Sequence, residues 1–486
     1  MHSSMEIAEN ALERLFSAEI DVSQALGVSV PQLRFALALF GSVPVGGGFR
    51  LIRNATVRHL YALVTGILLV YYPFGMGIAQ VVLPLSLTYG AMALMPSHCG
   101  KIAWLNMAYL IWLHVSNASG EAWNLGQMDF TGGSMVIVLK LIALAMSRQD
   151  ACRSKELNPY QAQHKVDHLP NLIEYLGYAF CCGNLLAGPF VEYHEYMDCV
   201  EEKGHWALQR TRSTGYVRYG LRKVGESLLS MVAMLYMEPR YGVTMLYKPW
   251  FQEQAVLTRL LLHWMCGVVC QLRYSFVWLL SEASLTFMGL NLKGWDDKER
   301  PIWGLCANCN FIGVQLSESA RALPQNWNTC TGRFLRRYVY DRLTPAGKRA
   351  GFPQLLATQL ISGVWHGLYP GYLLFFASSA LMFQASTGIA RVEALTLPDK
   401  VVRSLPVRLI HIIITGIMLN HLALSFVLLD FQRGISVFRD VHFIPHIFMT
   451  VMTLAALTLP DIRRSKQQGR DARKEQKTQA PAGKVE

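Results

Sequence analysis

The sequence predicts an all-α protein that crosses a membrane several times. Of its 486 residues, 52% are hydrophobic and only 16% are charged, whereas about a quarter of the residues of a soluble domain are charged. The mean hydropathy is positive, at +0.24. Long apolar stretches recur along most of the chain, and helices satisfy their own backbone inside lipid. These observations indicate a polytopic helical bundle of about ten to twelve membrane segments.

The apolar stretches are separated by short polar breaks. Several are shorter than the roughly 20 residues that a straight span needs. One of them is interrupted by Gly177, Gly183, Gly188 and Pro189, so it could be re-entrant or buried instead of crossing. The stretches cover residues 33–45, 59–77, 78–95, 102–115, 135–146, 172–190, 221–237, 257–271, 276–290, 352–383, 409–429 and 443–459. The segments too polar to span are 147–167 and 294–349.

Residues 1–30 are expected to form an N-terminal amphipathic segment. Glutamates stand where a secretory signal would carry basic residues, and no apolar run follows at once. A helix lying on the membrane surface fits the pattern, and a soluble helix packed on the first loops fits it equally well. The apolar residues at helical spacing are Met5, Ala8, Leu12, Leu15 and Phe16.

The basic residues indicate how the chain is oriented. The formal net charge is +12, and such an excess usually gathers in the cytoplasmic loops of a membrane protein. Residues 461–486 are rich in Lys, Arg and Gln and lack an apolar core, so we expect a disordered basic tail in the cytosol. Residues 31–460 then form the membrane domain. Nucleic acid is not an expected partner, because the basic residues are scattered among the spans and no binding motif is present.

A histidine in one of the later apolar stretches is the strongest candidate for a functional residue. His366 would be costly at membrane depth unless it faced a polar cavity. Pro370 has no amide hydrogen to donate to the carbonyl of His366, so the helix should kink there. Gly363, Gly367 and Gly371 would clear one helix face for close packing or for a ligand. The alternative is a histidine that only packs within the bundle.

Lys140 is a second ionisable residue within an apolar stretch. It needs a partner or a wet cavity. An internal ion pair with Asp129 or Glu174 is the first expectation, and a contact with a substrate is the second.

The segment 334–343 is expected to be an interfacial helix. Arg333, Arg336 and Arg337 gather on one side of it. The other side can dip into lipid through Leu335, Tyr338 and Val339. The arginines would either anchor the helix on anionic headgroups or contact the phosphates of an anionic substrate.

The cysteines do not predict a metal site. Cys306 and Cys309 form a CxxC motif, but no second pair follows at the spacing of a zinc site. The motif is either incidental or, at most, a lumenal disulfide.

Four segments carry a resemblance to a known family. Residues 365–372 read WHGLYPGY, residues 327–328 read WN ahead of RYVY at 337–340, residues 128–132 read MDFTG, and residues 169–189 run from LP through YLGY to GP. In this order they resemble the lysophospholipid acyltransferase branch of the membrane-bound O-acyltransferase family, and most closely its plant and algal lysophosphatidylcholine acyltransferases. In one departure, the chain reads Gln149-Asp150-Ala151 where the family often has an Asp-Gly pair.

The resemblance implies a helical bundle around a central reaction chamber, in a multi-pass protein of the endoplasmic reticulum. It implies that an acyl group passes from acyl-CoA, a substrate and not a retained cofactor, to lysophosphatidylcholine or another lysophospholipid during phospholipid remodelling. By resemblance, His366 is the general base and Asn328 is its polar partner. No Ser or Cys nucleophile with a positioned base is evident, so direct transfer is expected. The other substrate-binding candidates are Trp327, Trp365, Gly367, Gly371, Tyr372, Arg333, Arg336, Arg337 and Tyr340.

Two other classes of protein stay open at this point. A sibling acyltransferase that acts on a sterol, diacylglycerol or a protein would share His366 but should lack the segments at 128–132 and 169–189. A secondary transporter or channel could also carry broken helices and a histidine at mid-membrane, but it would more often show an internal repeat, which we do not find. Oligomeric state, acyl-chain preference and net direction are left open.

Overall fold

The computed structural model describes residues 2–118, 120, 125, 127–153, 157–208, 215–344 and 351–460, without the side chains of residues 2–12, 15 and 208. The fold is an all-α membrane bundle, which confirms the predicted fold class. Within the described residues the strands form one short antiparallel hairpin, β1 (Leu292–Trp295) and β2 (Pro301–Trp303). The expected tail at 461–486 lies outside this description.

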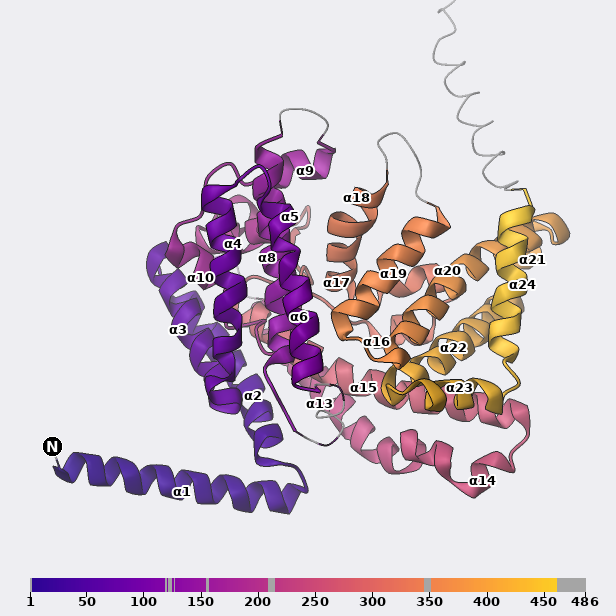
Figure 1. Cartoon of the computed structure of the whole chain (residues 1–486), viewed down its shortest axis with the longest axis horizontal. Helices are drawn as coiled ribbons and strands as arrows, with labels where there is room; N and C mark the ends of the chain where they lie inside the picture. Colours follow the sequence, from indigo (N-terminus) through magenta and orange to yellow (C-terminus); the bar gives the residue numbers. More distant parts are fainter. Residues whose placement is uncertain are drawn as a thin grey trace, which may run out of the picture.

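The helices fall into two groups along the chain, seen in Figure 1 as indigo to magenta on one side and orange to yellow on the other, with α13 to α15 beneath them. The first group comprises α1 (His2–Leu26), α2 (Val30–Leu51), α3 (Ala55–Phe74), η1 (Gly75–Val81), α4 (Val82–Leu94), α5 (Cys99–Ala103), α6 (Leu105–Ser116), α8 (Thr131–Ala151), α9 (Pro159–His164), α10 (Leu172–Ala179), α11 (Tyr193–Val200) and η2 (Gly204–Leu208).

The second half begins with the helices that link the two groups. These are α13 (Tyr216–Tyr241), η3 (Val243–Tyr247), α14 (Pro249–Gln252) and α15 (Val256–Met288). The helices that follow are α16 (Phe311–Gln315), η4 (Ala320–Gln325), α17 (Thr329–Phe334), the π-helix η5 (Leu335–Tyr340), α18 (Asp341–Leu343), α19 (Phe352–His366), α20 (Pro370–Thr396), α21 (Asp399–Val402), α22 (Leu405–Leu428), α23 (Phe431–Asp440) and α24 (Ile444–Thr458).

Five of the described helices are long and apolar enough to cross a membrane, or up to seven if each of two bent pairs is one span. The ten to twelve segments expected from the sequence also include shorter apolar stretches, several of which form helices too short to be counted here. The stretch 172–190, for example, supplies α10 and a turn that pack in the core. The five helices are Ala55–Leu94, Thr131–Ala151, Val256–Met288, Pro370–Thr396 and Leu405–Leu428.

The N-terminal helix α1 lies across one end of the bundle (Figure 1). The axis of its segment Phe16–Leu26 is bent by 101° from that of α2. Glu19 fixes this arrangement, since its carboxylate accepts from Arg34 Nη2 at 2.7 Å and from Tyr72 Oη at 2.5 Å. Phe16 is exposed, whereas the side chains of the other apolar positions predicted for this face lie outside the described residues.

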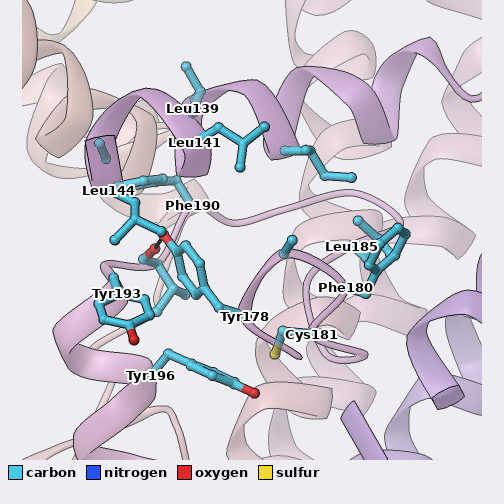
Figure 2. Close-up of a cluster of buried hydrophobic side chains, with 14 of the residues drawn as sticks. Leu139, Leu141, Leu144, Tyr178, Phe180, Cys181, Leu185, Phe190, Tyr193 and Tyr196 are labelled. Atoms are coloured by element: carbon cyan, nitrogen blue, oxygen red, sulfur yellow. Dashed lines mark hydrogen bonds between the residues drawn. The ribbon is translucent and has the colours of Figure 1, made fainter. Parts of the chain in front are cut away.

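The centre of the first group is a core around α8 and α10 (Figure 2). Tyr178 is fully buried there and donates its hydroxyl to the carbonyl of Val191 at 2.8 Å. Aliphatic side chains of α8, among them Leu141 and Leu144, pack around it. The core therefore fixes α8, whose N-terminal half forms part of the candidate site described below.

Lys140 is buried in this core, but its predicted ion pair is wrong. Lys140 Nζ donates to the carbonyl of Tyr178 at 2.9 Å and to Asn184 Oδ1 at 2.9 Å. Because α10 ends at Ala179, its last carbonyls lack intrahelical partners and attract a cation. The two carboxylates expected to pair with Lys140 bind nearby backbone groups instead. Asp129 accepts from the Thr131 amide, and Glu174 completes the N-terminal capping box of α10.

Candidate active site

His366 lies at a break between two helices, where the sequence predicts a kink. Helix α19 ends at His366, and Pro370 begins α20 at its first turn. Gly367 between them has φ +125°, which glycine adopts readily and other residues rarely do. Proline is well tolerated at the start of a helix because its missing amide would be unpaired there. The chain therefore stops one helix and starts another, and the His366 ring is placed at the junction.

The His366 ring is surrounded by aromatic side chains and has free nitrogens. Its centroid lies 5.3 Å from the stacked ring of Phe376 and 5.1 Å from the ring of Phe426. Over the described part of the chain, no group hydrogen-bonds either ring nitrogen of His366. Both nitrogens therefore remain available to a bound molecule.

The residue before His366 is held by two other helices. His114 Nε2 on α6 lies 3.1 Å from the carbonyl oxygen of Trp365, and Trp365 Nε1 donates to the carbonyl of Met135 on α8 at 3.1 Å. These bonds fix the end of α19 and therefore the orientation of His366. Sequence reasoning missed His114, although it also lies in an apolar stretch, and the argument used for His366 would have identified it.

The two glycines of the WHGLYPGY segment serve close packing. A Cβ on Gly371 would come within 2.2 Å of the carbonyl oxygen of Ser425 on α22, and one on Gly367 within 3.3 Å of the His114 ring. A real Cβ does not approach an oxygen as closely as 2.2 Å, so Gly371 lets α20 and α22 touch through their backbones, whereas the 3.3 Å contact at Gly367 is only tight.

Asn328 stands at the start of α17 in the left-handed conformation, with φ 46° and ψ 45°. Asparagine tolerates this conformation better than most residues. Its side chain makes no capping bond to the helix. Instead Asn328 Oδ1 accepts from Asn308 Nδ2 at 3.2 Å, and Asn308 Oδ1 accepts from the Cys330 amide at 3.0 Å. Asn308, which sequence reasoning missed, thus orients the Asn328 amide.

His366 and Asn328 line one cavity of about 270 Å³, although 38 positions of sequence number separate them. Apolar side chains form most of its wall, and Asp129 from the MDFTG segment, Asn308 and His114 add polar groups. Of the other predicted site residues, those that line it are Trp365 and Tyr372. Those placed outside its wall are Trp327, Gly367, Gly371, Arg333, Arg336, Arg337 and Tyr340.

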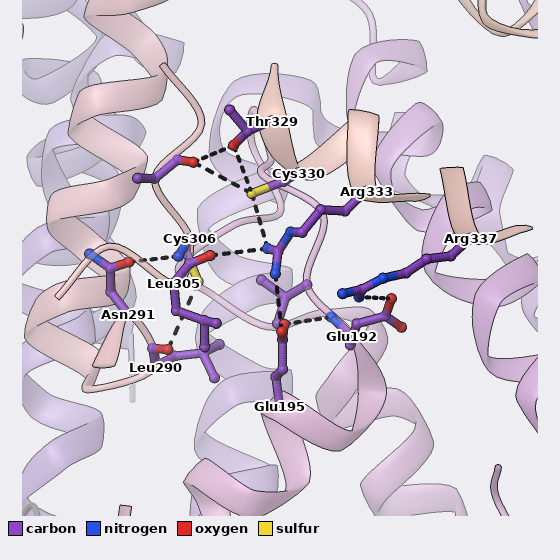
Figure 3. Close-up of polar contacts among 12 residues, drawn as sticks. Glu192, Glu195, Leu290, Asn291, Leu305, Cys306, Thr329, Cys330, Arg333 and Arg337 are labelled. Carbon is purple, nitrogen blue, oxygen red and sulfur yellow. Dashed lines mark hydrogen bonds and ion pairs between the residues drawn. The ribbon is translucent and has the colours of Figure 1, made fainter. Parts of the chain in front are cut away.

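The predicted arginine cluster is divided between the interior and the surface. Arg333 Nη1 pairs with Glu195 Oε1 of α11 at 3.1 Å, and Arg337 Nη1 pairs with Oε1 of Glu192, the N-cap of α11, at 3.1 Å (Figure 3). Arg336 is exposed. The two ion pairs fasten the segment that carries Asn328 to the first group of helices.

The segment 334–343 is not an interfacial helix with one face in lipid. Tyr338 and Val339 are 2% and 3% exposed and belong to the protein core. The Tyr338 hydroxyl donates to Glu192 Oε2 at 2.8 Å. Tyr338 therefore binds the Glu192 carboxylate inside the protein, whereas the sequence predicts that it dips into lipid.

Two other sequence features have structural roles. Asp150, at the departure from the family pattern, lies at the end of α8 and accepts two bonds from Arg342, at 2.8 and 2.5 Å. Cys306 and Cys309 are both free buried thiols, so the CxxC motif does not form the disulfide that was one of its two interpretations.

Comparison with known proteins places this geometry in a family context. The model of the membrane-bound O-acyltransferase family matches residues 115–426, which include His366 and Asn328. The chain is 36% identical over 443 residues to lysophospholipid acyltransferase 1 of Arabidopsis thaliana, covering 90% of this chain and 96% of that protein. It is 36% identical over 445 residues to lysophospholipid acyltransferase 2 of the same plant, covering 90% and 95%. It is 25% identical over 460 residues to membrane-bound glycerophospholipid O-acyltransferase 1 of Mus musculus, covering 89% and 91%.

Proposed function

Because the chain belongs to the membrane-bound O-acyltransferase family and is an integral-membrane acyltransferase, we propose that it transfers an acyl group from acyl-CoA to a lysophospholipid, with His366 as general base. The observation that carries the proposal is the shared cavity, in which a histidine with free ring nitrogens and an oriented amide meet. The names of the similar plant proteins support a lysophospholipid as acceptor.

The reaction needs one proton to move from the acceptor to the leaving group. The free glycerol hydroxyl of the lysolipid gives its proton to a ring nitrogen of His366 as its oxygen attacks the thioester carbonyl carbon. The carbon–sulfur bond then breaks, and the thiolate of coenzyme A takes that proton as it leaves. Neither ring nitrogen of His366 has a competing partner in the described residues, so the base is ready in the resting protein.

Asn328 is proposed to stabilise the negative charge that develops on the carbonyl oxygen. An oriented amide donor in a poorly hydrated site stabilises such an oxyanion without reorganising during the reaction. Asn308 donates to Asn328 Oδ1, which leaves the NH₂ group of Asn328 free to donate into the cavity. The bond between the two asparagines therefore sets which end of the amide faces the substrate.

Transfer is proposed to be direct, without an acyl-enzyme. A thiol nucleophile needs a base to activate it. Cys270 lines the same cavity, but across the described chain no histidine nitrogen hydrogen-bonds its sulfur. The lysolipid itself is therefore the group that His366 activates.

We further propose that lysophosphatidylcholine is one acceptor and that the enzyme works in phospholipid remodelling in the endoplasmic reticulum membrane. Acyl-CoA would reach the cavity from the cytosol, where coenzyme A is made available, and the lysolipid from the bilayer. Arg336 is the exposed member of the arginine cluster and is the one free to contact a phosphate of coenzyme A.

The test is an acceptor panel. Purified enzyme in lipid nanodiscs receives labelled acyl-CoA together with lysophosphatidylcholine, another lysophospholipid, a sterol or diacylglycerol. Label in the diacyl phospholipid is the expected result. Label only in a sterol ester or in triacylglycerol would reject the lysophospholipid acceptor and identify a sibling activity.

A further inference from the structure

A second, more polar cavity adjoins the one that holds His366. It encloses about 480 Å³, and Arg273 and Val427 line both cavities, so the two meet at these residues. Glu238 and Arg433 also line the second cavity. We call it the vestibule. Its lining residues come from the start of α2, from α13, η3 and α15, and from α22 and α23, and α23 lies in the lower part of the view in Figure 1.

The junction of the two cavities is close to the candidate base. Tyr274, which follows Arg273 on α15, lines the His366 cavity. The Phe426 ring lies 6.5 Å from the ring of Tyr274 and 5.1 Å from that of His366. If a bound molecule places a charged group at Arg273, a hydroxyl only a few bonds from that group lies near His366.

The vestibule presents both signs of charge. Arg273 Nη2 and Glu238 Oε2 lie 3.0 Å apart and join α15 to α13. The two side chains are 39% and 38% exposed, so each has an open side toward the cavity. Arg433 on α23 is exposed and pairs with no carboxylate among the residues described. Two guanidinium groups and one carboxylate thus stand at the mouth of a mostly apolar chamber.

Building on the proposed function, we propose that the vestibule binds the zwitterionic headgroup of the lysophospholipid. Arg273 and Arg433 bind the phosphate, and Glu238 binds the quaternary ammonium. A guanidinium group matches a phosphate with two parallel hydrogen bonds. The headgroup brings an opposite charge to each member of the ion pair, so the pair opens and neither charge is left without a partner.

This role differs from a purely structural one in what it predicts. A half-exposed ion pair adds little to stability, so removing it leaves the fold intact in either case. If the ion pair between Arg273 and Glu238 were only structural, replacing either residue would affect the acylation of all lysophospholipids equally. A headgroup site gives Glu238 an effect that depends on whether the lipid carries a cation, and Arg273 an effect on every lysophospholipid.

The experiment compares Glu238→Gln and Arg273→Gln with the wild type on lysophosphatidylcholine and lysophosphatidylglycerol, whose headgroup has the phosphate but no ammonium. Loss of one charged contact to the headgroup should raise the KM for the lysophospholipid about tenfold. Glu238→Gln should therefore lower the ratio of kcat/KM for the choline lipid over the glycerol lipid about tenfold. Arg273→Gln should raise KM for both lipids, and the KM for acyl-CoA should stay unchanged in both variants.

The chain offers a matched control in Glu318→Gln. Glu318 pairs with Arg408 at 2.7 Å and is 39% exposed, but it lines a different cavity that shares no lining residue with the His366 chamber. The headgroup ratio should not change in this variant.

Three results would overturn the inference: an unchanged headgroup ratio in Glu238→Gln, an equal change in Glu318→Gln, or a rise in KM for acyl-CoA alone. A wild-type enzyme that acylates no lysophospholipid would reject the proposed function itself, which separates the two failures.

Discussion

Replacing Asn328 with glycine separates the chemical role of its amide from the demands of its backbone. Asn328 has φ 46° and ψ 45°, and its side chain does not cap α17. Glycine adopts this conformation at no steric cost, so Asn328→Gly removes the amide without adding strain. Asn328→Ala removes the same amide but keeps a Cβ in the left-handed region, which costs about 1–2 kcal/mol relative to glycine.

The expected magnitudes follow from these contacts. Loss of one donor aimed at an oxyanion lowers kcat by roughly 10²–10³-fold, and Asn328→Gly and Asn328→Ala should share this loss. The free energy of unfolding should fall by no more than about 1 kcal/mol in the glycine variant. Asn328→Asp retains the oxygen that accepts from Asn308 but replaces the donor with a charge, so it should be as slow as the glycine variant.

The assay is the initial rate at saturating acyl-CoA and lysophosphatidylcholine, with the melting temperature of each variant measured in the same lipid. A glycine variant that turns over at the wild-type rate would refute the reasoning, because it would show that position 328 needs only a residue that tolerates the left-handed conformation. A slow glycine variant with a near-normal melting temperature is the predicted outcome.

Two further predictions concern residues at and around the cavity. Cys270→Ala should retain the wild-type rate if transfer is direct, and no acyl group should remain on the denatured protein after a quench; loss of activity with a normal melting temperature would favour an acyl-enzyme. Arg337→Gln should lower the free energy of unfolding by up to about 3 kcal/mol, because it leaves Glu192 buried without its cation, whereas Arg336→Gln should hardly change it and should raise the KM for acyl-CoA. Equal stability of the two arginine variants, measured by thermal unfolding, would contradict the ion-pair assignment.

The position of the helix break at His366 could be predicted from the sequence, because it depends on one residue, Pro370. Proline lacks an amide hydrogen wherever it stands, so Pro370 predicts an interruption near His366 whatever surrounds it. The sequence did not show that the interruption would be complete, because this depends on Gly367 adopting φ +125° beside His114.

Partners that depend on tertiary packing could not be predicted in the same way. Lys140 was expected to pair with a carboxylate, but it binds backbone carbonyls that are accessible to its ammonium group because α10 ends at Ala179. Likewise, Asn308 lies in a polar loop with no distinguishing pattern, and its bond to Asn328 exists because the chain folds back between them.

The number of long apolar helices differs from the number of apolar stretches for a physical reason. Apolarity alone does not distinguish a short helix buried in protein from a segment in lipid, since both exclude water. Helix α10 illustrates this, because it is only 8 residues long and its Tyr175 and Tyr178 are buried inside the protein.

The most direct test of the central claim is the rate of acyl transfer by His366→Ala in lipid nanodiscs, with His168→Ala, an exposed histidine outside the cavity, as the matched control. Removing a general base typically costs about 10²–10⁴-fold. The account predicts a loss of that size in His366→Ala, with an unchanged melting temperature and an unchanged rate in His168→Ala. A folded His366→Ala variant that acylates lysophosphatidylcholine at the wild-type rate would contradict it.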